Sequence, residues 1–175
     1  MDLEKYIGVI NNFPKKGISF KDISPLLKNP EAFRYCISEI KKKVEKYNPT
    51  IIVGPESRAF IFGIALAQEM NLGFVMARKP GKLPGNLISI SYGLEYGEET
   101  LSIQEDALSQ NDRVLLIDDL MATGGTLAAL KELIIKVGAT PVAAVTPITL
   151  KELNGDKKVG LPFETLLYLS DKVEE

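Results

Sequence analysis

Two adjacent carboxylates and a run of small residues stand out in the segment 114–126, VLLIDDLMATGGT. Asp118 and Asp119 follow an apolar run that is typical of a buried parallel strand. The loop after them contains Ala122, Thr123, Gly124, Gly125 and Thr126. Its glycines let the backbone turn tightly, and its free amide groups, its hydroxyls and the positive end of the following helix can bind one anion. We therefore expect a phosphate cradle that uses no lysine.

The two carboxylates argue against a site for phosphate alone, because like charges repel each other. They suit a sugar phosphate, since Asp118 and Asp119 can accept hydrogen bonds from ribose hydroxyls or reach a bound Mg²⁺ through water. The structural alternative makes Asp118 a cap or turn residue and Asp119 a solvated side chain. The loop has neither the Gly-Lys-Ser/Thr ending of a P-loop nor the GxGxxG spacing, which disfavours both common nucleotide motifs.

The residues that the chain lacks narrow the chemistry further. Its 175 residues include no histidine, which excludes Ser/His/Asp and Cys/His nucleophiles and imidazole metal sites. Cys36 is the only cysteine, which excludes an intramolecular disulfide and suggests a reducing compartment. The net charge of −2 gives no general attraction for nucleic acid or anionic lipid, so we expect neither as a partner. The N-terminal segment is acidic and no long apolar run occurs, which predicts a cytoplasmic protein.

The elements that must hold the cradle alternate between strands and helices. The predicted strands cover 51–53, 73–77, 114–117, 141–145 and 165–169, and the predicted helices cover 30–47, 59–67 and 127–137. This alternation predicts one α/β domain, residues 1–175, with an open, mostly parallel sheet flanked by helices. Ligands in such sheets lie beyond the carboxyl ends of the strands. The candidate site loops are therefore those after Val53, Ala77 and Ile117.

The segment 88–96 has a different pattern. Ile88, Ile90 and Tyr92 alternate with polar residues, which is typical of a half-exposed strand. We expect a turn over 97–100 and a returning strand that begins at Leu101. The two strands would form an exposed β-ribbon, or lid, over about 88–105.

The segment 114–126 closely resembles the phosphoribosyl-diphosphate binding motif of type I phosphoribosyltransferases. Four further segments resemble the adenine phosphoribosyltransferases within that family. They are 13–25 (FPKKGISFKDISP), 54–60 (GPESRAF), 77–84 (ARKPGKLP), and 91–97 with 103–107 (SYGLEYG and IQEDA). The resemblance implies the type I phosphoribosyltransferase fold, with a small N-terminal hood over about 1–30 and a flexible ribbon as the lid.

The resemblance also implies a reaction and a set of site residues. The 5-phosphoribosyl group of phosphoribosyl diphosphate would move to N9 of adenine, giving AMP and diphosphate, in a homodimer that uses Mg²⁺ held mainly by the substrate. The cradle would bind the 5-phosphate, and Asp118 and Asp119 the ribose. The diphosphate would meet Glu56, Ser57, Arg58, Arg78, Lys79, Lys82 and Tyr96, with the lysines reaching across the dimer interface. Adenine would lie on Ser19, Phe20 and Lys21, with the Phe20 ring packed on the purine and backbone groups reading its edge. An unusual peptide bond is expected between Glu56 and Ser57.

Glu95, on the predicted lid, is the candidate catalytic residue. Adenine must lose its N9 proton as it attacks, and a lid carboxylate can handle that proton in a chain without histidine. The alternative is that Glu95 is only a solvated strand residue, and that Lys79 and Lys82 are only solvated loop charges. A lid is expected in either case from the chemistry, because water would otherwise attack the activated sugar.

Two other functions stay open at this point. The first is a phosphoribosyltransferase for hypoxanthine, guanine or xanthine, since the hood's backbone groups would decide between a 6-amino and a 6-oxo group. The second is a regulator that binds phosphoribosyl diphosphate without catalysis, although the first twelve residues are too short for a helix-turn-helix domain. Ser19, Ala59 and Glu105 depart from the usual family pattern and bear on affinity and rate more than on reaction type.

Overall fold

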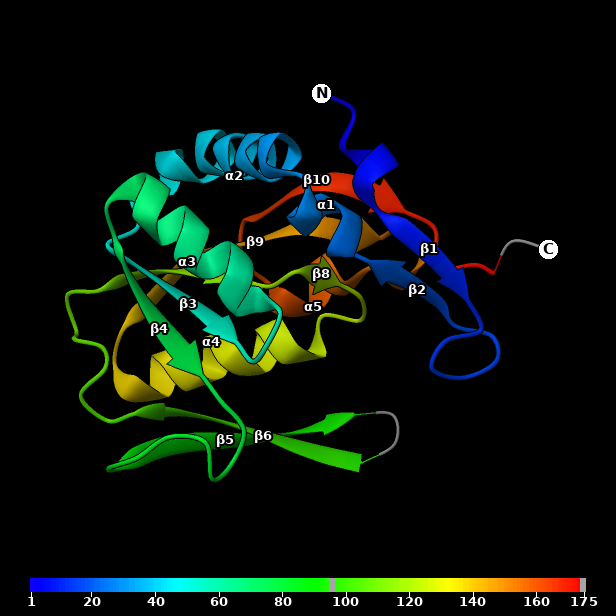
Figure 1. Ribbon diagram of the computed structural model, residues 1–175. Coiled ribbons are helices and arrows are strands. Elements are labelled where there is room, and N and C mark those ends of the chain that lie inside the picture. Colours follow the sequence, from blue (N-terminus) through cyan, green and yellow to red (C-terminus); the bar gives the residue numbers. More distant parts are fainter. Residues whose placement is uncertain (95–96, 174–175) are drawn as a thin grey trace.

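A computed structural model describes residues 1–94 and 97–173 of the chain (Figure 1). Its centre is a six-stranded sheet in the order β10-β9-β7-β3-β4, in which β8 pairs with β9 and every pairing is parallel. The strands are β3 (Ile51–Pro55), β4 (Gly73–Ala77), β7 (Arg113–Ile117), β8 (Leu120–Met121), β9 (Thr140–Leu150) and β10 (Phe163–Leu169). The predicted open parallel sheet is confirmed.

Helices cover both faces of this sheet. On one face lie α2 (Pro30–Val44) and α3 (Ala59–Met70), and on the other lies α4 (Gly125–Val137) (Figure 1). Alternate residues of a strand point to opposite faces. Accordingly Ile52 and Leu115 belong to the core under α2 and α3, whereas Val53 and Leu116 belong to the core under α4. Because both faces are buried, the strands consist of near-continuous apolar runs.

The predicted helix boundaries are right where a capping residue marks them. The Asn29 side chain accepts hydrogen bonds from the first-turn amides of α2, and Gly138 ends α4 with a φ of +97°. A shorter helix, α5 (Gly155–Val159), follows β9 and was not predicted.

The N-terminal hood is a small antiparallel hairpin beside the sheet. β1 (Gly8–Asn11) pairs with β2 (Ser19–Asp22), flanked by the 3-10 helix η1 (Leu3–Tyr6) and by α1 (Ser24–Lys28). Two more 3-10 turns, η2 (Glu45–Tyr47) and η3 (Lys151–Leu153), complete the elements. Among the described residues, no helix combines the length and apolar character that a membrane crossing needs.

The ribbon consists of β5 (Leu87–Leu94) and β6 (Gly97–Gln104) in antiparallel pairing. Its predicted alternation is confirmed, since Ile88, Ile90 and Tyr92 pack against the α4 core. The predicted turn over 97–100 is wrong, because β6 already begins at Gly97. Cross-strand bonds explain the longer ladder: the Ser91 and Thr100 hydroxyls lie 2.8 Å apart, and each residue faces the other in register.

Candidate active site

The two carboxylates and the small-residue loop connect β7 to α4. Gly124 is the N-cap residue of α4 and has a φ of +78°, a conformation that favours glycine, whereas Gly125 is the first residue of the helix. The loop encloses a hollow of about 80 Å³, lined by Asp118 and residues 120–127. Pockets for whole drug-sized ligands start near roughly 300 Å³, so this hollow suits a single group such as a phosphate.

The start of α5 backs this loop through direct backbone contact. A methyl group built on Gly124 would collide with the carbonyl oxygen of Gly155, and one built on Gly155 would lie 2.7 Å from the Gly124 nitrogen. Neither position has room for a side chain. Lys158, on the same short helix, has its Nζ 3.6 Å from a methyl group built on Gly125. The sequence reasoning missed both Gly155 and Lys158, because a glycine after Asn154 signals only an ordinary turn.

The neighbouring carboxylates have different surroundings. Asp119 is buried, and its Oδ2 lies 2.9 Å from an Nη of Arg58. Asp118 is half-buried, and its Oδ1 accepts a hydrogen bond of 2.8 Å from the Asp119 amide. Burial and the adjacent carboxylate raise the pKa of Asp118 well above its usual value. Burial also raises the pKa of Asp119, although the Arg58 guanidinium opposes that rise.

Arg58 connects the carboxylates to the hood. It precedes α3, and its guanidinium carbon lies 5.3 Å from the centre of the Phe20 ring, within cation–π distance. Phe13 supports the same ring in an edge-to-face contact at 5.2 Å. The structure thus brings together Phe20, Arg58 and Asp119, three residues from separate predicted motifs.

Ser19 and Lys21 are on the opposite face of β2 from Phe20. Both side chains are buried, and the Lys21 ammonium donates a hydrogen bond of 2.8 Å to the Ser19 hydroxyl. Alternation along the strand accounts for this, because only every second side chain can face the site. The prediction that Ser19 and Lys21 bind adenine therefore rests on their backbone groups alone.

Glu56 organises the loop that follows β4. Its carboxylate accepts a hydrogen bond from the Lys79 amide and lies 3.4 Å from an Nη of Arg78. Partial burial favours the protonated form, but these two contacts outweigh it and lower the pKa of Glu56. The peptide bond between Glu56 and Ser57 is cis, at the position where an unusual peptide was expected.

The Lys79 side chain is tied to the ribbon. Its Nζ lies 3.0 Å from Oε1 of Glu99, whose Oε2 accepts a 3.0 Å hydrogen bond from the Tyr92 hydroxyl. The Lys79 contact and, more weakly, the Tyr92 bond lower the pKa of Glu99 against partial burial. The sequence reasoning missed Glu99, because it placed this residue in the predicted turn over 97–100. Glu95 and Tyr96 lie outside the described residues.

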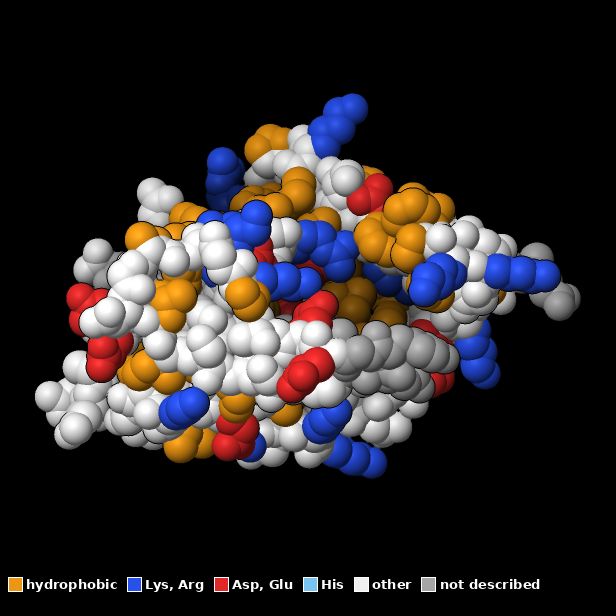
Figure 2. Space-filling view, turned by 90° about the horizontal axis from the view of Figure 1, so that it is seen from below, with side chains coloured by type: hydrophobic (Ala, Val, Ile, Leu, Met, Phe, Trp, Pro, Cys, Tyr) orange, Lys and Arg blue, Asp and Glu red, His pale blue; other side chains and the backbone are white. Residues whose placement is uncertain are grey.

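The candidate residues follow three adjacent strands. Ser57 and Arg58 come after β3, Arg78 after β4, and Asp118 after β7, so the site lies at the carboxyl ends of neighbouring parallel strands, as predicted. Seen from the side of β5 and β6, Figure 2 shows lysine and arginine side chains around a hollow, with acidic and hydrophobic side chains among them.

The donor set fits a magnesium ion held mainly by substrate. Mg²⁺ prefers oxygen ligands and is usually bound by one or two carboxylates together with substrate phosphates. Within residues 1–94 and 97–173, no group of three acidic or cysteine side chains could hold a metal by itself. Asp119 is already paired with Arg58, so Asp118 is the carboxylate better placed to contribute.

Comparison with known proteins identifies the family. The sequence pattern of the phosphoribosyl transferase domain matches residues 22–161. An adenine phosphoribosyltransferase of Methanococcus vannielii is 47% identical over 172 residues, which cover 98% of this chain and 99% of that protein. One from Gluconobacter oxydans is 47% identical over 167 residues, 95% of this chain and 93% of that protein.

Solved structures agree with these relatives. Adenine phosphoribosyltransferase from Thermoanaerobacter pseudethanolicus superposes with a TM-score of 0.93 at 41% identity, covering 96% of this chain and 98% of that one. The Saccharomyces cerevisiae enzyme, in complex with an imino-altritol bisphosphate and adenine, gives 0.91 at 37% identity, covering 95% and 97%. The matched span runs from the end of β2 through both carboxylates and the cradle to just past α5, and the chain belongs to the phosphoribosyltransferase family.

Proposed function

We propose that this protein is an adenine phosphoribosyltransferase of purine salvage. In the reaction, N9 of adenine bonds to C1 of the ribose while the bond from C1 to the diphosphate oxygen breaks, and the N9 proton leaves. The observation that carries the proposal is the contact of Arg58 with both Phe20 and Asp119, which joins a purine-stacking ring to a sugar-binding carboxylate pair. The near full-length similarity to adenine enzymes supports the choice of base.

The cradle would bind the 5-phosphate, and the carboxylates would bind the ribose. The free amides of the loop Ala122–Thr126, the Thr123 and Thr126 hydroxyls and the helix dipole of α4 all favour an anion there. Asp118 would accept hydrogen bonds from the ribose hydroxyls. Asp119 would hold Arg58 in place through their 2.9 Å contact.

The diphosphate would lie between the loops that follow β3 and β4. Arg58 faces this region, with the backbone of Glu56 and Ser57 beside it. The Nε of Arg78 is buried and has no hydrogen-bond partner among the residues described. A buried donor without a partner costs free energy, and a diphosphate oxygen would satisfy it. Mg²⁺ would add positive charge around the departing diphosphate when it is bound.

Glu95 and Tyr96 complete the proposal from the predicted lid. The Glu95 carboxylate would take the N9 proton of adenine, and Tyr96 would meet the diphosphate. Both roles rest on the family motif and on the chemistry, since a base at N9 is needed and the chain has no histidine.

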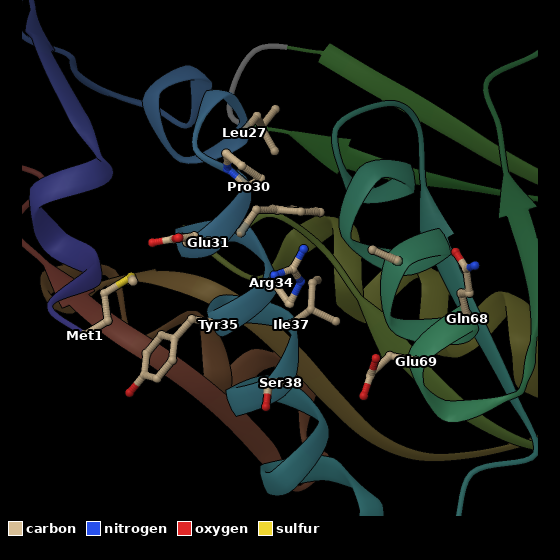
Figure 3. A pocket seen from close by; sticks show the side chains of 12 residues that line it. Met1, Leu27, Pro30, Glu31, Arg34, Tyr35, Ile37, Ser38, Gln68 and Glu69 are labelled. Atoms are coloured by element: carbon tan, nitrogen blue, oxygen red, sulfur yellow. The ribbon is translucent and has the colours of Figure 1, made fainter.

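A second copy of the chain would complete the enzyme as a homodimer. Ile61 and Ile64 on α3 and Met76 on the edge strand β4 are large apolar side chains with at least 41% of their surface exposed. Helix α3 also borders an open groove of about 1000 Å³ on its α2 side, whose lining includes Pro30, Ile37 and Gln68 (Figure 3). Exposed apolar patches of this kind favour association. In the dimer, Lys79 and Lys82 would reach the partner's diphosphate. A monomer at assay concentration in sedimentation equilibrium would contradict this arrangement.

The test is nucleotide formation from phosphoribosyl diphosphate and Mg²⁺, with adenine, hypoxanthine, guanine and xanthine offered separately. We expect AMP from adenine and at least about a hundredfold lower kcat/KM with each oxopurine, because a site built for an amino donor leaves polar groups unpaired with an acceptor. Preference for an oxopurine would overturn the assignment of the base. Absence of product from all four, with the sugar diphosphate still bound, would indicate a regulator instead.

A further inference from the structure

The loop Ala122–Thr126 carries no basic side chain, yet its ligand would be a phosphate with up to two negative charges. Asp118 lines the same hollow and adds negative charge there when it is ionised. Backbone amides and a helix dipole offset part of this charge. A cation from another part of the chain would offset the rest, and α5 carries two lysines close by.

The position of α5 is fixed at both of its ends. At the first end, Gly155 packs directly against the backbone of Ala122 and Gly124, where no side chain would fit. At the other end, Val159 is fully buried in the core under α4, and its carbonyl accepts a 3.0 Å hydrogen bond from Lys131 Nζ. The residues between these anchors therefore have little freedom to rotate about the helix axis.

This fixed orientation places Lys158 beside the cradle. Its Nζ lies 3.6 Å from a methyl group built on Gly125, the first residue of α4, and the Thr123 hydroxyl is 3.8 Å from the same point. Lys131 contacts both a carboxylate and a carbonyl, but Lys158 forms no ion pair or hydrogen bond within the described part of the chain. An exposed ammonium held next to free amides and a hydroxyl, with no acid to neutralise it, is suited to an incoming anion.

We propose that Lys158 binds the 5-phosphate of the sugar diphosphate, supplying from α5 the cation that the cradle loop lacks. The proposal rests on the proposed function, because it takes the cradle to be the 5-phosphate site. Lys158 is then a binding residue, and the contact between Gly124 and Gly155 positions it beside the phosphate.

The experiment measures binding of ribose 5-phosphate and of Mg²⁺-diphosphate by calorimetry, on the full chain and on three variants. Ribose 5-phosphate requires the cradle, whereas diphosphate binds at the opposite end of the site. We expect Lys158→Ala to weaken ribose 5-phosphate about tenfold, as the loss of one charge-assisted contact does, while diphosphate changes less than about twofold. Lys158→Arg should restore most of the affinity.

Lys157→Ala is the matched control, because it removes the same charge from the neighbouring exposed position of α5. Equal losses of ribose 5-phosphate affinity in Lys157→Ala and Lys158→Ala would overturn the proposal, and so would equal weakening of both ligands by Lys158→Ala. If the wild-type chain makes no AMP but binds ribose 5-phosphate with this dependence, only the assignment of adenine fails. If wild type makes AMP but does not bind ribose 5-phosphate, only the assignment of Lys158 fails; if it neither makes AMP nor binds ribose 5-phosphate, both proposals fail.

Discussion

The two ends of the proposed site are held by different kinds of contact. At the phosphate end, the backbones of Gly124 and Gly155 touch, and the buried Met121 side chain packs beside Gly155. At the diphosphate end, the Lys79 side chain is held by Glu99 through an ion pair whose side chains are 50% and 34% exposed. Close backbone packing allows almost no adjustment, whereas exposed ion pairs contribute little and break easily.

This difference matches what each end must do. The 5-phosphate stays on the same ribose from substrate to product, so a preformed site can hold it throughout the chemical step. The diphosphate must leave, so its end has to open in every cycle. The loop after β4 combines both kinds of contact. The mostly buried Glu56 carboxylate fixes the start of this loop, whereas the Lys79 and Lys82 side chains stay exposed.

The largest effect should come from Gly124→Ala. The new methyl group would collide with the Gly155 carbonyl, and the φ of +78° disfavours any side chain. Strain and displacement together should lower the free energy of unfolding by about 3 kcal/mol. Urea unfolding measures this loss, and ribose 5-phosphate affinity should fall with it.

Gly125→Ala is the matched control for that change. Its methyl group would have no neighbour nearer than 3.6 Å, and the backbone at Gly125 is helical. The free energy of unfolding should therefore change by less than about 0.5 kcal/mol. This variant should lose ligand affinity only. Equal destabilisation of the two variants would remove the claimed distinction between a glycine that the fold needs and one that only the ligand needs.

Asp118→Asn should separate stability from binding. Because the fold raises the pKa of Asp118, the folded protein disfavours its ionised form, and stability falls as the pH rises from the ordinary aspartate pKa through the raised one. The substitution should therefore stabilise the ligand-free protein at neutral pH while raising the KM for phosphoribosyl diphosphate about tenfold or more. Urea unfolding between pH 4 and 8 and steady-state kinetics provide the two measurements.

Asp112→Asn should have the opposite effect on stability. The amide of Ser109 donates a 2.7 Å hydrogen bond to Asp112, and this contact above all lowers the pKa of that carboxyl. Its stabilisation is present above the ordinary pKa and is lost as the pH falls through the lowered one. If Asp118→Asn lost as much stability as Asp112→Asn, the ionised Asp118 carboxylate would not be unfavourable in the folded protein, and the prediction for Asp118 would be wrong.

The smallest effect should come from Glu99→Gln, at the diphosphate end. Breaking an exposed ion pair releases Lys79, so the KM for phosphoribosyl diphosphate should fall by at most about fivefold, and less at high salt. Glu98→Gln is the control, since Glu98 is exposed and forms no ion pair in the part of the chain described. A large, salt-independent change in Glu99→Gln would show that this end is as tightly built as the cradle.

Local patterns were enough to predict the parallel sheet and the edge of it at which the candidate residues lie. The strand 73–77 was predicted with its observed bounds, and Asn29 and Gly138 marked helix ends through their own side-chain or backbone chemistry. The carboxyl ends of β3, β4 and β7 then had to meet, because parallel neighbours share an edge.

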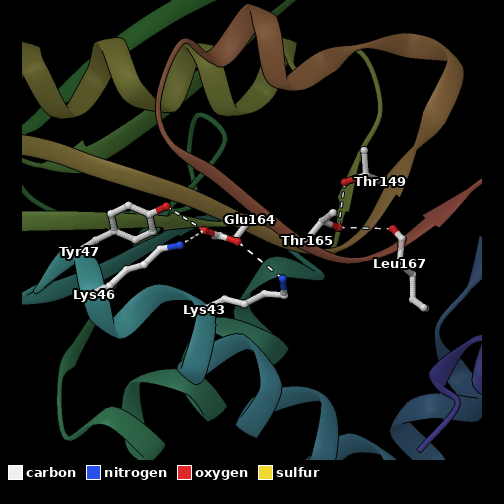
Figure 4. Close-up of polar contacts among 7 residues, drawn as sticks. All are labelled: Lys43, Lys46, Tyr47, Thr149, Glu164, Thr165 and Leu167. Carbon is white, nitrogen blue, oxygen red and sulfur yellow. Dashed lines mark hydrogen bonds and ion pairs between the residues drawn. The ribbon is translucent and has the colours of Figure 1, made fainter.

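Features that depend on partners distant in sequence could not be predicted. α5 has five residues, too few for a helical period, and its purpose appears only where Gly155 meets Gly124. The strand 165–169 was predicted, but the side-chain partners of β10 were not: Lys46 and the Tyr47 hydroxyl both contact its Glu164, and the Thr149 hydroxyl bonds to Thr165 at 3.0 Å (Figure 4). Residue spacing cannot predict such pairs, since 117 residues separate Tyr47 from Glu164.

The contact between Gly124 and Gly155 also determines the stage of synthesis at which the protein can bind the sugar phosphate. A growing chain that has emerged only as far as α4 already contains the carboxylates and the whole cradle loop. It has nothing behind that loop until β9 and α5 follow. Substrate can therefore stabilise the protein only after α5 has been made, so a chain truncated before α5 should gain no protection from the sugar phosphate that protects a chain containing it.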